Sequence, residues 1–507
     1  MADAAPLHLS KSRFVAGVQC HKQLWWRVHE PDAPELVPEP ALRNRFDQGA
    51  EVGRVARGYV PGGELIDLPF HEYDNKVAAT RDALRRDPPA VYEATFLADD
   101  TYAQVDILER EPGGDPRGEG RTGYRVIEVK ATNRLKVEHI PDVAIQVHVL
   151  RKSGLPVTGA DIMHLNRDCR FPDLDNLFIR EDVTALVEGY LLGVPEEVAA
   201  QLQALRGPIP RISIGEHCTR PHQCPFIDRC WPPLPDHHVS SLYRIDRAKV
   251  LEYEADGYAT MLDLPSDLEL SAIHARQVKA VTIGAMVVES GLAAALAEFT
   301  APLAYLDFET ISLAIPRWNG CRPWENVPVQ FSCHTEGRGS ALHHSEWIAD
   351  GPEDPRPSLA RALVEACAGA RRVVAYHASF ERECIRHLEA HVPSLARPLA
   401  RIRERLIDLL PTVRNHIYHP NFGGSFGLKR VLPPLVPGLS YGDLQINDGE
   451  IASLELMRLL LRRDELRDAE RTRLRRALLA YCERDSWAMV KLLERLRGLV
   501  GVQLELF

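Results

Sequence analysis

Four cysteines constrain the fold of this chain more than any other feature. Cys20 stands near the N-terminus, and Cys218, Cys224 and Cys230 follow in the run HCTRPHQCPFIDRCW. The three fall within 13 residues, are interleaved with proline and histidine, and follow neither a helical nor a strand period. Burial as small hydrophobic residues is therefore a poor explanation, and ligation of a metal is favoured. One shared ion or cluster would require the segment between the lone cysteine and the trio to fold back on itself.

Four thiolates suit two kinds of centre. They can hold a 4Fe–4S cluster, and they satisfy tetrahedral zinc equally well. His217 and His222 lie in the same run and add nitrogen ligands that favour zinc. The remaining cysteines are scattered and are predicted to be structural: Cys169, Cys321, Cys333, Cys367, Cys384 and Cys482.

Composition predicts a cytoplasmic protein without a membrane span. The 507 residues allow two to four domains, and no apolar run approaches the ~18 residues that cross a bilayer. The first residues lack the apolar core of a secretory signal, and a reducing compartment favours metal ligation over disulfides. A net charge of −10 argues against a large nonspecific nucleic-acid coat, but a binding groove can be basic locally.

The pattern of apolar and turn residues predicts an α/β organisation in three parts. Residues 1–235 form the part tied by the cysteines, residues 236–300 a helical connector, and residues 301–507 a second domain that alternates strand and helix. A polar hairpin loop is expected at 111–123. Helices are predicted around 14–26, 41–58, 139–154, 183–205 and 477–496, and strands at 91–96, 102–108, 124–131 and 302–310.

The first part carries a candidate metal site on neighbouring strands. Asp106 ends an alternating strand, and Glu128 and Lys130 lie two apart on the next strand, so their side chains share one face. Two carboxylates can hold Mg²⁺ or Mn²⁺, which polarise a phosphate and activate a water. Lys130 can stabilise developing charge, and Gln146 on the following helix can reach the same place. An ordinary surface ion pair is the alternative for so short a motif.

These motifs together resemble the iron–sulfur RecB-type nucleases, a group that includes the AddB nuclease domain and the four-cysteine nucleases of CRISPR adaptation. The resemblance spans residues 8–232 and implies a PD-(D/E)xK restriction-endonuclease-like fold. It implies metal ligation by Asp106 and Glu128, with Lys130 as the catalytic lysine and Gln146 as the helix glutamine. It also implies a 4Fe–4S cluster on all four cysteines: Cys20, Cys218, Cys224 and Cys230.

One departure from that group concerns the first core helix, where many relatives carry a further histidine or acidic metal ligand. The matching stretch here, FDQGAEVGRVA, offers Glu51 and no histidine. Glu93 in YEATF is a second candidate. We expect both to be structural.

The second domain carries a second set of acids. Asp307 and Glu309 in YLDFET share one face of a strand flanked by apolar residues, and buried acids are costly unless they bind cations. Glu381 follows near the start of a helix, and Tyr481 and Asp485 lie four apart on another helix. Three carboxylate elements and a tyrosine can hold two metal ions about 4 Å apart. Taken alone, Tyr481 and Asp485 would be an exposed helical pair.

These residues resemble the DEDD exonucleases, the RNase H-like superfamily that includes the DnaQ proofreading subunit. DFE matches the first motif, YHASFE the second, and YCERD the tyrosine version of the third. The departure is Glu381, where the family has aspartate. Lesser candidates are Asp408, which would shape the fold, His377, which would contact a nucleotide or pack, and Lys429 and Arg430, which would contact a strand from a glycine-rich loop. A solvated turn is the alternative for that loop.

The order of parts resembles a bacterial family that fuses a RecB-like half to a DnaQ-like half. We therefore expect a hydrolase of phosphodiester bonds, combining a PD-(D/E)xK nuclease with a 3′-to-5′ exonuclease. Its substrate would be DNA with a single-stranded or frayed end, in repair, recombination or phage defence. Two alternatives stay open: one half, more readily the C-terminal half because of Glu381, is a silent module that binds nucleic acid or a partner, or the substrate is RNA. Tryptophans that can stack on bases, or simply pack in cores, are Trp25, Trp26, Trp318 and Trp324.

Overall fold

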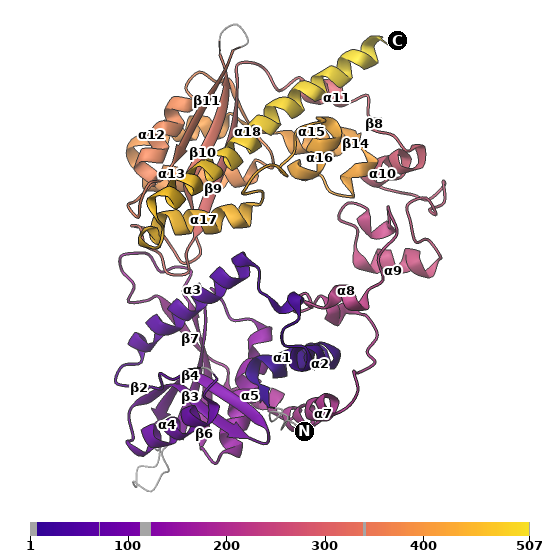
Figure 1. Ribbon diagram of the computed structural model, residues 1–507. Coiled ribbons are helices and arrows are strands. Elements are labelled where there is room, and N and C mark those ends of the chain that lie inside the picture. Colours follow the sequence, from indigo (N-terminus) through magenta and orange to yellow (C-terminus); the bar gives the residue numbers. More distant parts are fainter. Residues whose placement is uncertain (1–7, 70, 112–122, 338–340, 506–507) are drawn as a thin grey trace. The chain divides into compact units, whose positions relative to one another are not determined.

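The computed structural model describes residues 8–69, 71–111, 123–337 and 341–505 (Figure 1). The chain forms two compact units with mixed α/β structure. Unit 1 comprises Met1–Pro232 and Leu313–Glu325, and unit 2 comprises Pro233–Ser312 and Asn326–Phe507. The stretch predicted to be a separate connector, 236–300, lies inside unit 2, and a short insertion after the DFE strand belongs to unit 1. The predicted hairpin loop at 111–123 lies almost entirely outside the described residues.

Unit 1 alternates helices with the strands of a single sheet. Its helices are α1 (Lys11–Gln19), α2 (His21–His29), α3 (Pro40–Ala56), α4 (Tyr73–Arg85), α5 (Ile140–Lys152), α6 (Thr184–Leu191), α7 (Val194–Arg206) and α8 (Ile227–Cys230). Its strands are β1 (Leu9–Ser10), β2 (Glu64–Leu65), β3 (Ala90–Ala98), β4 (Thr101–Glu111), β5 (Gly123–Lys130), β6 (Val157–Leu165) and β7 (Phe178–Asp182).

The sheet of unit 1 has the strand order β2-β3-β4-β5-β6-β7, with β1 beside β4. Strands β3, β4 and β5 form an antiparallel meander, and Ile107 of β4 pairs with Ile127 of β5. The chain then passes through α5 and returns as β6, parallel to β5. A parallel return needs such a crossover because its two strands start at the same edge of the sheet.

Helix α5 is apolar on nearly every side, and this explains its central place. Pro141 fits the first turn, where its missing N–H costs nothing. Val143, Ile145, Val147 and Val149 are almost fully buried, and the helix packs against β3 and β4. Each such side chain contributes about 1.5–3 kcal/mol through burial. Gly154, with φ of +85°, reverses the chain directly after the helix.

Two helices predicted as continuous are interrupted. The first breaks at Cys20, whose extended backbone separates α1 from α2 while its N–H still donates to Ala16 O at 2.9 Å. The second, predicted over 183–205, breaks at Gly193 between α6 and α7. The break at Cys20 has a consequence, because it places the cysteine at a helix junction instead of on a regular helix face.

Unit 2 also alternates strand and helix. Its helices are α9 (Arg247–Ala255), α10 (Ala272–Ile283), α11 (Leu292–Leu296), α12 (Arg356–Ala366), α13 (Ser379–His391), α14 (Ala396–Glu404), α15 (Leu409–His416), α16 (Leu428–Leu435), α17 (Gly449–Leu461) and α18 (Asp468–Glu505). Its strands are β8 (Val287–Val288), β9 (Leu303–Ser312), β10 (Asn326–Glu336), β11 (Leu342–Ile348), β12 (Arg372–Ala375), β13 (Leu406–Asp408) and β14 (Ile417–Tyr418).

The main sheet of unit 2 has the order β11-β10-β9-β12-β13. Strands β9, β10 and β11 form an antiparallel meander, whereas β12 runs parallel to β9 and β13 runs parallel to β12. Alternate residues of β9 face different layers: Leu306 and Phe308 join the core beside α12, α13 and α14, and Leu303 and Tyr305 join the core beside α18. Since side chains alternate along a strand, Asp307 faces the α18 side.

Candidate active sites and metal centre

The first acidic cluster lies where β4, β5 and α5 meet in unit 1. Glu128 on β5 is 1% exposed, and its Oε2 accepts a hydrogen bond from Nε2 of Gln146 on α5 at 2.7 Å. Its Oε1 accepts from Lys130 Nζ at 2.8 Å. Asp106 on β4 is half-buried and accepts from the backbone N–H of Val129 at 2.7 Å. The structure thus brings together all four residues predicted for this site.

The structure adds two members that the sequence did not point to. Lys11 at the start of α1 donates from Nζ to Glu128 Oε1 at 2.7 Å. Asp142 in the first turn of α5 accepts a second hydrogen bond from Lys130. Asp142 stands in the same helix as Gln146, one turn earlier, so helical spacing alone could have linked the two. Lys11 carries no comparable signal, because its approach depends on how α1 packs.

The two carboxyl groups of this cluster have pKa values shifted in opposite directions. Burial disfavours ionisation of Glu128, but Lys11 and Lys130 outweigh it and lower the Glu128 pKa below its usual range. Burial together with the neighbouring Glu128 raises the pKa of Asp106 to about 7. Glu128 is therefore a permanent anion, whereas Asp106 ionises fully only above neutral pH or when a cation arrives. Two such oxygens can hold a hard divalent ion with water and phosphate completing its shell.

The two weaker acidic candidates of unit 1 have other partners. Glu51 lies exposed on α3 and pairs with Arg54 at 3.0 Å. Glu93 lies on β3 with φ of +57° and accepts from Arg57 Nη2 at 2.6 Å and from the Gln104 amide. Its negative charge is one of those that raise the pKa of Asp106. Glu93 therefore borders the site with its oxygens engaged by donors, and Glu51 stands apart from it.

The second acidic cluster lies in unit 2 between β9 and α18. Carboxylate oxygens of Asp307, Glu309 and Asp485 all lie within 4.8 Å of one another. Asp307 and Glu309 are half-buried, and Asp485 is 8% exposed. Tyr481 and Asp485 are buried, which rules out the alternative of an exposed helical pair, because α18 packs across β9 and β10. Strand β9 and helix α18 thus both contribute acidic residues to this cluster.

Glu381 stands in the first turn of α13 and is 3% exposed. Its Oε2 is buried without a hydrogen-bond partner among the described residues. Burial raises its pKa to about 8, and the nearby charges of Asp408 and Asp485 add to the effect. A buried, unpartnered carboxylate oxygen is costly unless it binds a cation or a proton. Glu381 thus has the character of a ligand that awaits an ion.

Two carboxyl groups of this cluster, Asp307 and Glu309, favour the protonated form in the absence of a cation. Burial and the charge of Asp485 raise the pKa values of both Asp307 and Glu309 well above their usual range. The pKa of Asp485 rises only to about 6, because burial is opposed by a hydrogen bond from Tyr441 and by the charge of Lys429. Like charges at such separations cannot all ionise. The arrangement favours binding of one or two divalent cations.

Tyr481 lies beside the acids with its hydroxyl held by a lysine. Lys429 Nζ donates to Tyr481 Oη at 3.0 Å and to Asn447 O at 2.7 Å. The phenol ring is 3% exposed, and burial together with Asp485 keeps the pKa of Tyr481 high, so the hydroxyl stays protonated. Tyr441, which the sequence did not single out, donates to Asp485 Oδ1. The glycine-rich loop was predicted to present Lys429, whereas the residue lies in the first turn of α16.

The remaining candidate residues of unit 2 have different positions and contacts in the structure. Asp408 caps α15 and also accepts from the N–H of His377 at 2.9 Å, so it shapes the chain around the cluster as predicted. His377 is exposed at the turn before α13, with φ of +69°. Arg430 is exposed on α16 beside Lys429. Only Lys429 of this group reaches the acids' tyrosine.

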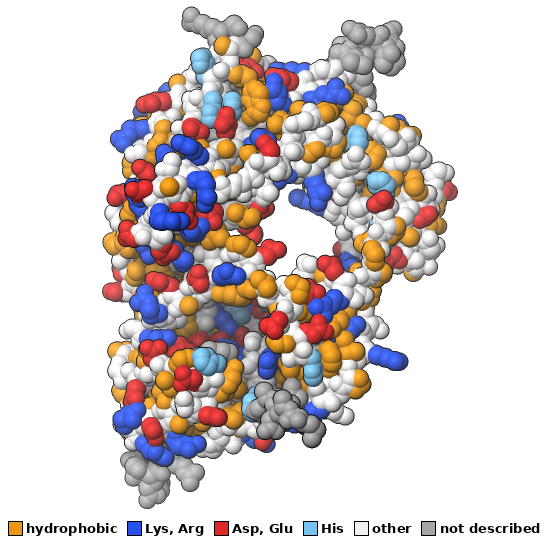
Figure 2. Space-filling model, in the orientation of Figure 1, with side chains coloured by type: hydrophobic (Ala, Val, Ile, Leu, Met, Phe, Trp, Pro, Cys, Tyr) orange, Lys and Arg blue, Asp and Glu red, His pale blue; other side chains and the backbone are white. Residues whose placement is uncertain are grey.

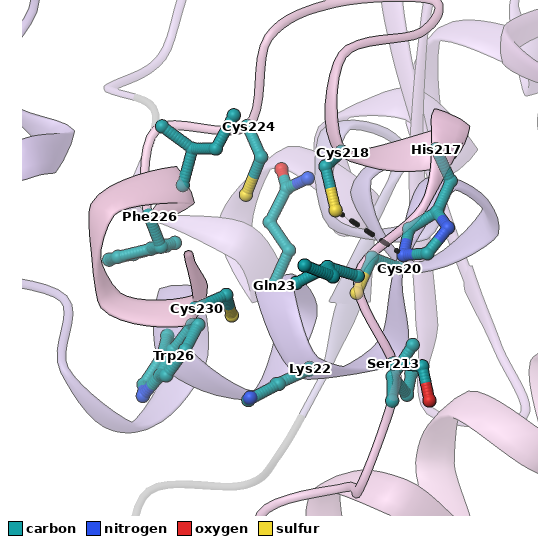
Figure 3. Close-up of a pocket in the computed structure, with 13 residues that line it drawn as sticks. Cys20, Lys22, Gln23, Trp26, Ser213, His217, Cys218, Cys224, Phe226 and Cys230 are labelled. Carbon is teal, nitrogen blue, oxygen red and sulfur yellow. Dashed lines mark hydrogen bonds between the residues drawn. The ribbon is translucent and has the colours of Figure 1, made fainter. Parts of the chain in front are cut away.

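The four predicted cysteines line one pocket of unit 1 (Figure 3). Cys20 comes from the junction of α1 and α2, Cys218 and Cys224 come from the segment that leads into α8, and Cys230 is the last residue of α8. Gln19 joins the two parts by donating from Nε2 to the carbonyls of His217 and His222, both at 2.7 Å. Cys218 and Cys224 are buried, and Figure 3 shows the four sulfur atoms around a common space.

The donors around these sulfurs fit thiolates. The N–H of Gly215 points at Cys218 Sγ at 3.5 Å, and His217 Nε2 lies 3.7 Å from the same sulfur. Gln23, 3% exposed, carries a buried Nε2 without a partner among the described residues and lines the same pocket. Burial and the other thiols raise the pKa of Cys224. Such a pocket disfavours free thiolates, but a bound metal centre would stabilise them, and the thiolate sulfurs would then accept from the nearby N–H donors.

Of the tryptophans proposed to stack on bases, each has a structural explanation. Trp25 donates from Nε1 to Gly207 O at 3.1 Å. Trp26 and Trp318 are 8% and 5% exposed. Trp324 donates to Ala131 O within unit 1. Packing in cores and loops, the alternative given above, accounts for these four tryptophans.

The surface carries both signs of charge. Figure 2 shows lysine and arginine interspersed with aspartate and glutamate on the face in view. The mixture agrees with the overall charge of −10. Among the described residues, no helix combines the length and the apolar character needed to cross a membrane.

Comparison with known proteins adds one match. Residues 304–427 match a family model described as a domain of unknown function (DUF2779). The matched stretch includes Asp307, Glu309 and Glu381 and ends before Lys429, Tyr481 and Asp485. A search among curated proteins finds no match to this chain.

Proposed function

We propose that this chain is a metal-dependent nuclease with one phosphodiesterase site in each unit, acting on DNA with a single-stranded or frayed end. The observation that carries the proposal is the convergence of Asp307, Glu309 and Asp485, whose oxygens lie within 4.8 Å of one another under α18. Three acids from two distant elements have no stable reason to meet except to bind cations. Repair, recombination and phage defence are the processes that such an enzyme would serve.

The topology of unit 1 supports a PD-(D/E)xK nuclease. Its antiparallel β3–β4–β5 meander, the crossover helix α5 and the parallel strand β6 follow the order of that fold. Asp106, Glu128 and Lys130 stand on the second and third strands of the meander, and Gln146 stands on the crossover helix. This placement agrees with the roles that the resemblance to RecB-type nucleases implies.

The topology of unit 2 supports an RNase H-like exonuclease of the DEDD type. The sheet order β11-β10-β9-β12-β13, with β12 and β13 parallel to the first strand, follows that fold. Asp307 and Glu309 lie on its first strand, and Tyr481 and Asp485 lie on its last helix. Glu381 replaces the usual aspartate, and its buried free oxygen supports a role as ligand despite the longer side chain.

The residues of each site would divide the work. Asp106 and Glu128 in unit 1 and the acid cluster in unit 2 would hold Mg²⁺ or Mn²⁺, which would supply charge neutralisation and a more acidic water. Lys130 stands beside Glu128 to stabilise charge on the phosphate. In unit 2 the Lys429 ammonium donates to the Tyr481 hydroxyl oxygen, and the phenolic proton faces Asp485. That proton would orient a water or a phosphate oxygen once Asp485 binds a cation.

The four cysteines fit a 4Fe–4S cluster better than zinc. Sulfurs bound to one tetrahedral zinc at about 2.3 Å must lie close together, roughly 3.8 Å apart. Among the described residues, no three of the four thiols have sulfurs within 4.8 Å of one another. A 4Fe–4S cluster binds each thiolate through a different iron and therefore accepts sulfur atoms that lie farther apart. Its role would be structural, closing the chain between Cys20 and the trio.

The deciding experiment is a pair of single substitutions assayed on end-labelled single-stranded DNA with Mn²⁺. We expect Asp106→Asn and Asp307→Asn each to remove one class of products by on the order of 10²-fold or more, a loss of about 3 kcal/mol of transition-state stabilisation. The exposed Asp82→Asn and Asp468→Asn serve as matched controls. If Asp307→Asn leaves all products unchanged, unit 2 is a silent binding module. If matched RNA is cut faster than DNA, the substrate class is wrong.

A further inference from the structure

A second group of possible metal ligands lies in unit 2 outside the acid cluster. His334 on β10 and His344 on β11 are directly paired across the two strands, and their rings stack at 4.5 Å. Glu483 reaches them from α18, with Oε1 3.9 Å from His344 Nδ1. One ligand atom of each of the three residues lies within 4.8 Å of the others.

Two serines fix which nitrogen of each histidine carries a proton. Ser486 Oγ lies 3.1 Å from Glu483 O, and because a carbonyl oxygen can only accept, the Ser486 proton goes to it. Ser332 Oγ lies 2.7 Å from Ser486 Oγ, so Ser332 must donate its proton to Ser486. Both serine oxygens are then left as acceptors for the histidines.

The histidine tautomers follow from these directions. His344 Nε2, 2.9 Å from Ser332 Oγ, must donate, and His334 Nδ1, 2.9 Å from Ser486 Oγ, must donate as well. The other ring nitrogens, His344 Nδ1 and His334 Nε2, then carry lone pairs. His344 Nδ1 faces the carboxylate of Glu483, so two acceptors oppose each other. Such a pair repels unless a cation lies between them.

We propose that His334, His344 and Glu483 form a binding site for a divalent transition-metal ion of the zinc class. Two imidazole nitrogens and one carboxylate oxygen are ligands that zinc and its neighbours accept, with water in a fourth position. Each histidine has its remaining ring nitrogen hydrogen-bonded to a serine, the arrangement that orients metal-binding imidazoles. The all-oxygen acid cluster, by contrast, suits Mg²⁺ or Mn²⁺.

The site has a clear structural consequence. Its ligands come from β10, β11 and α18, and α18 also carries Tyr481 and Asp485. Ser486 follows Asp485 directly in the chain, and Ser332 pairs across the sheet with Asp307. A metal ion there would pin α18 to the sheet about two residues, or ~7 Å of strand, from the acid cluster. The site is thus a second metal centre that steadies the helix and does not depend on nuclease activity.

The test is zinc binding to the full-length protein in the presence of excess Mg²⁺, which occupies the oxygen-only sites. We expect wild type to bind one more equivalent of Zn²⁺ than His344→Ala, and Glu483→Gln to bind that equivalent at least tenfold more weakly. The neighbouring His343→Ala is the matched control, because residue 343 faces the other side of β11. The difference between variants cancels any zinc held by the cysteines.

A second measurement keeps the proposal falsifiable if a variant unfolds. Zn²⁺ should raise the melting temperature of wild type and of His343→Ala, and this increase should be smaller in Glu483→Gln, whose side chain is exposed. Equal zinc stoichiometry and equal melting shifts in wild type, His344→Ala and Glu483→Gln would overturn the proposal. So would a nitrogen NMR signature of His344 protonated on both nitrogens at neutral pH with Zn²⁺ present.

Discussion

Replacing Glu381 with glutamine should make the metal-free protein more stable, and more so as pH rises. The side chain is 3% exposed, its Oε2 has no hydrogen-bond partner among the described residues, and burial raises its pKa to about 8. Glutamine keeps the shape of the side chain and removes the charge. The substitution therefore isolates the cost of ionising a buried carboxyl group without a cation.

The sign and size follow from linkage. Glu381 has a pKa of 4.5 in the unfolded chain and about 8 in the fold, so the folded protein holds the proton more tightly. This contribution to stability is complete below pH 4.5 and is lost as the pH rises through about 8. At 1.36 kcal/mol per unit, the relative penalty for wild type is about 1.4 kcal/mol at pH 5.5 and roughly 4 to 5 kcal/mol at pH 8.5. The advantage of Glu381→Gln over wild type should thus grow by about 3 kcal/mol across this range.

The assay is urea unfolding at both pH values with a chelator present, followed by pulsed hydrogen exchange of peptides from unit 2. Glu383→Gln on the same helix is the control, because Glu383 is exposed and pairs with Arg386 in the next turn. That control should track wild type at both pH values. An advantage of Glu381→Gln that stays the same at pH 5.5 and 8.5 would refute the reasoning.

Divalent ions should reverse the order of stability of wild type and Glu381→Gln. Mn²⁺ binds the ionised carboxylates of wild type and so contributes stability by mass action, whereas Glu381→Gln has lost a charged ligand. At pH 8.5 we expect saturating Mn²⁺ to stabilise wild type more than the variant. Equal stabilisation of both proteins would mean that Glu381 does not contact the ion.

Three further predictions concern unit 1. Lys11→Met should cost about 1–3 kcal/mol in urea unfolding, since Glu128 loses a buried donor; an unchanged midpoint would contradict this. Cys224→Ser should remove bound iron and its absorption near ~400 nm, and a variant that keeps both would exclude the cysteine as a ligand. In the Asp307→Asn background, the Mn²⁺ dissociation constant should rise as pH falls below about 7, where Asp106 takes up a proton, and pH-independent binding would contradict that assignment.

Much of each site could be predicted because its residues lie on regular elements with a known period. Glu128 and Lys130 lie two apart on a strand, and Tyr481 and Asp485 lie four apart on a helix, so the sequence alone determines that each pair shares a face. Burial was harder. The period of α18 is the same whether its acids face water or β9, and only the packing of that helix across the sheet decides.

Two of the residues that sequence reasoning missed, Lys11 and Tyr441, share one physical trait. Lys11 and Tyr441 reach their carboxylates from segments far along the chain, with a single polar atom each. No short spacing links either residue to its partner, and lysine and tyrosine are ordinary surface residues in a sequence. The break of the first helix at Cys20 was missed for a similar reason, because its residues favour helix and only the fold turns the chain there.

The two acid clusters balance their buried negative charge in different ways. This difference determines how each cluster would respond to a metal ion. In unit 1 the negative charge of Glu128 is already balanced by Lys11 and Lys130, so an arriving cation competes with two ammonium groups. In unit 2 the only lysine that any described contact brings to the acids' tyrosine is Lys429, and raised pKa values leave protons to balance the rest. A cation entering unit 2 must displace protons, whereas one entering unit 1 must chiefly displace side chains. Metal occupancy in unit 2 should therefore depend more steeply on pH, and in unit 1 more on whether α1 can release Lys11.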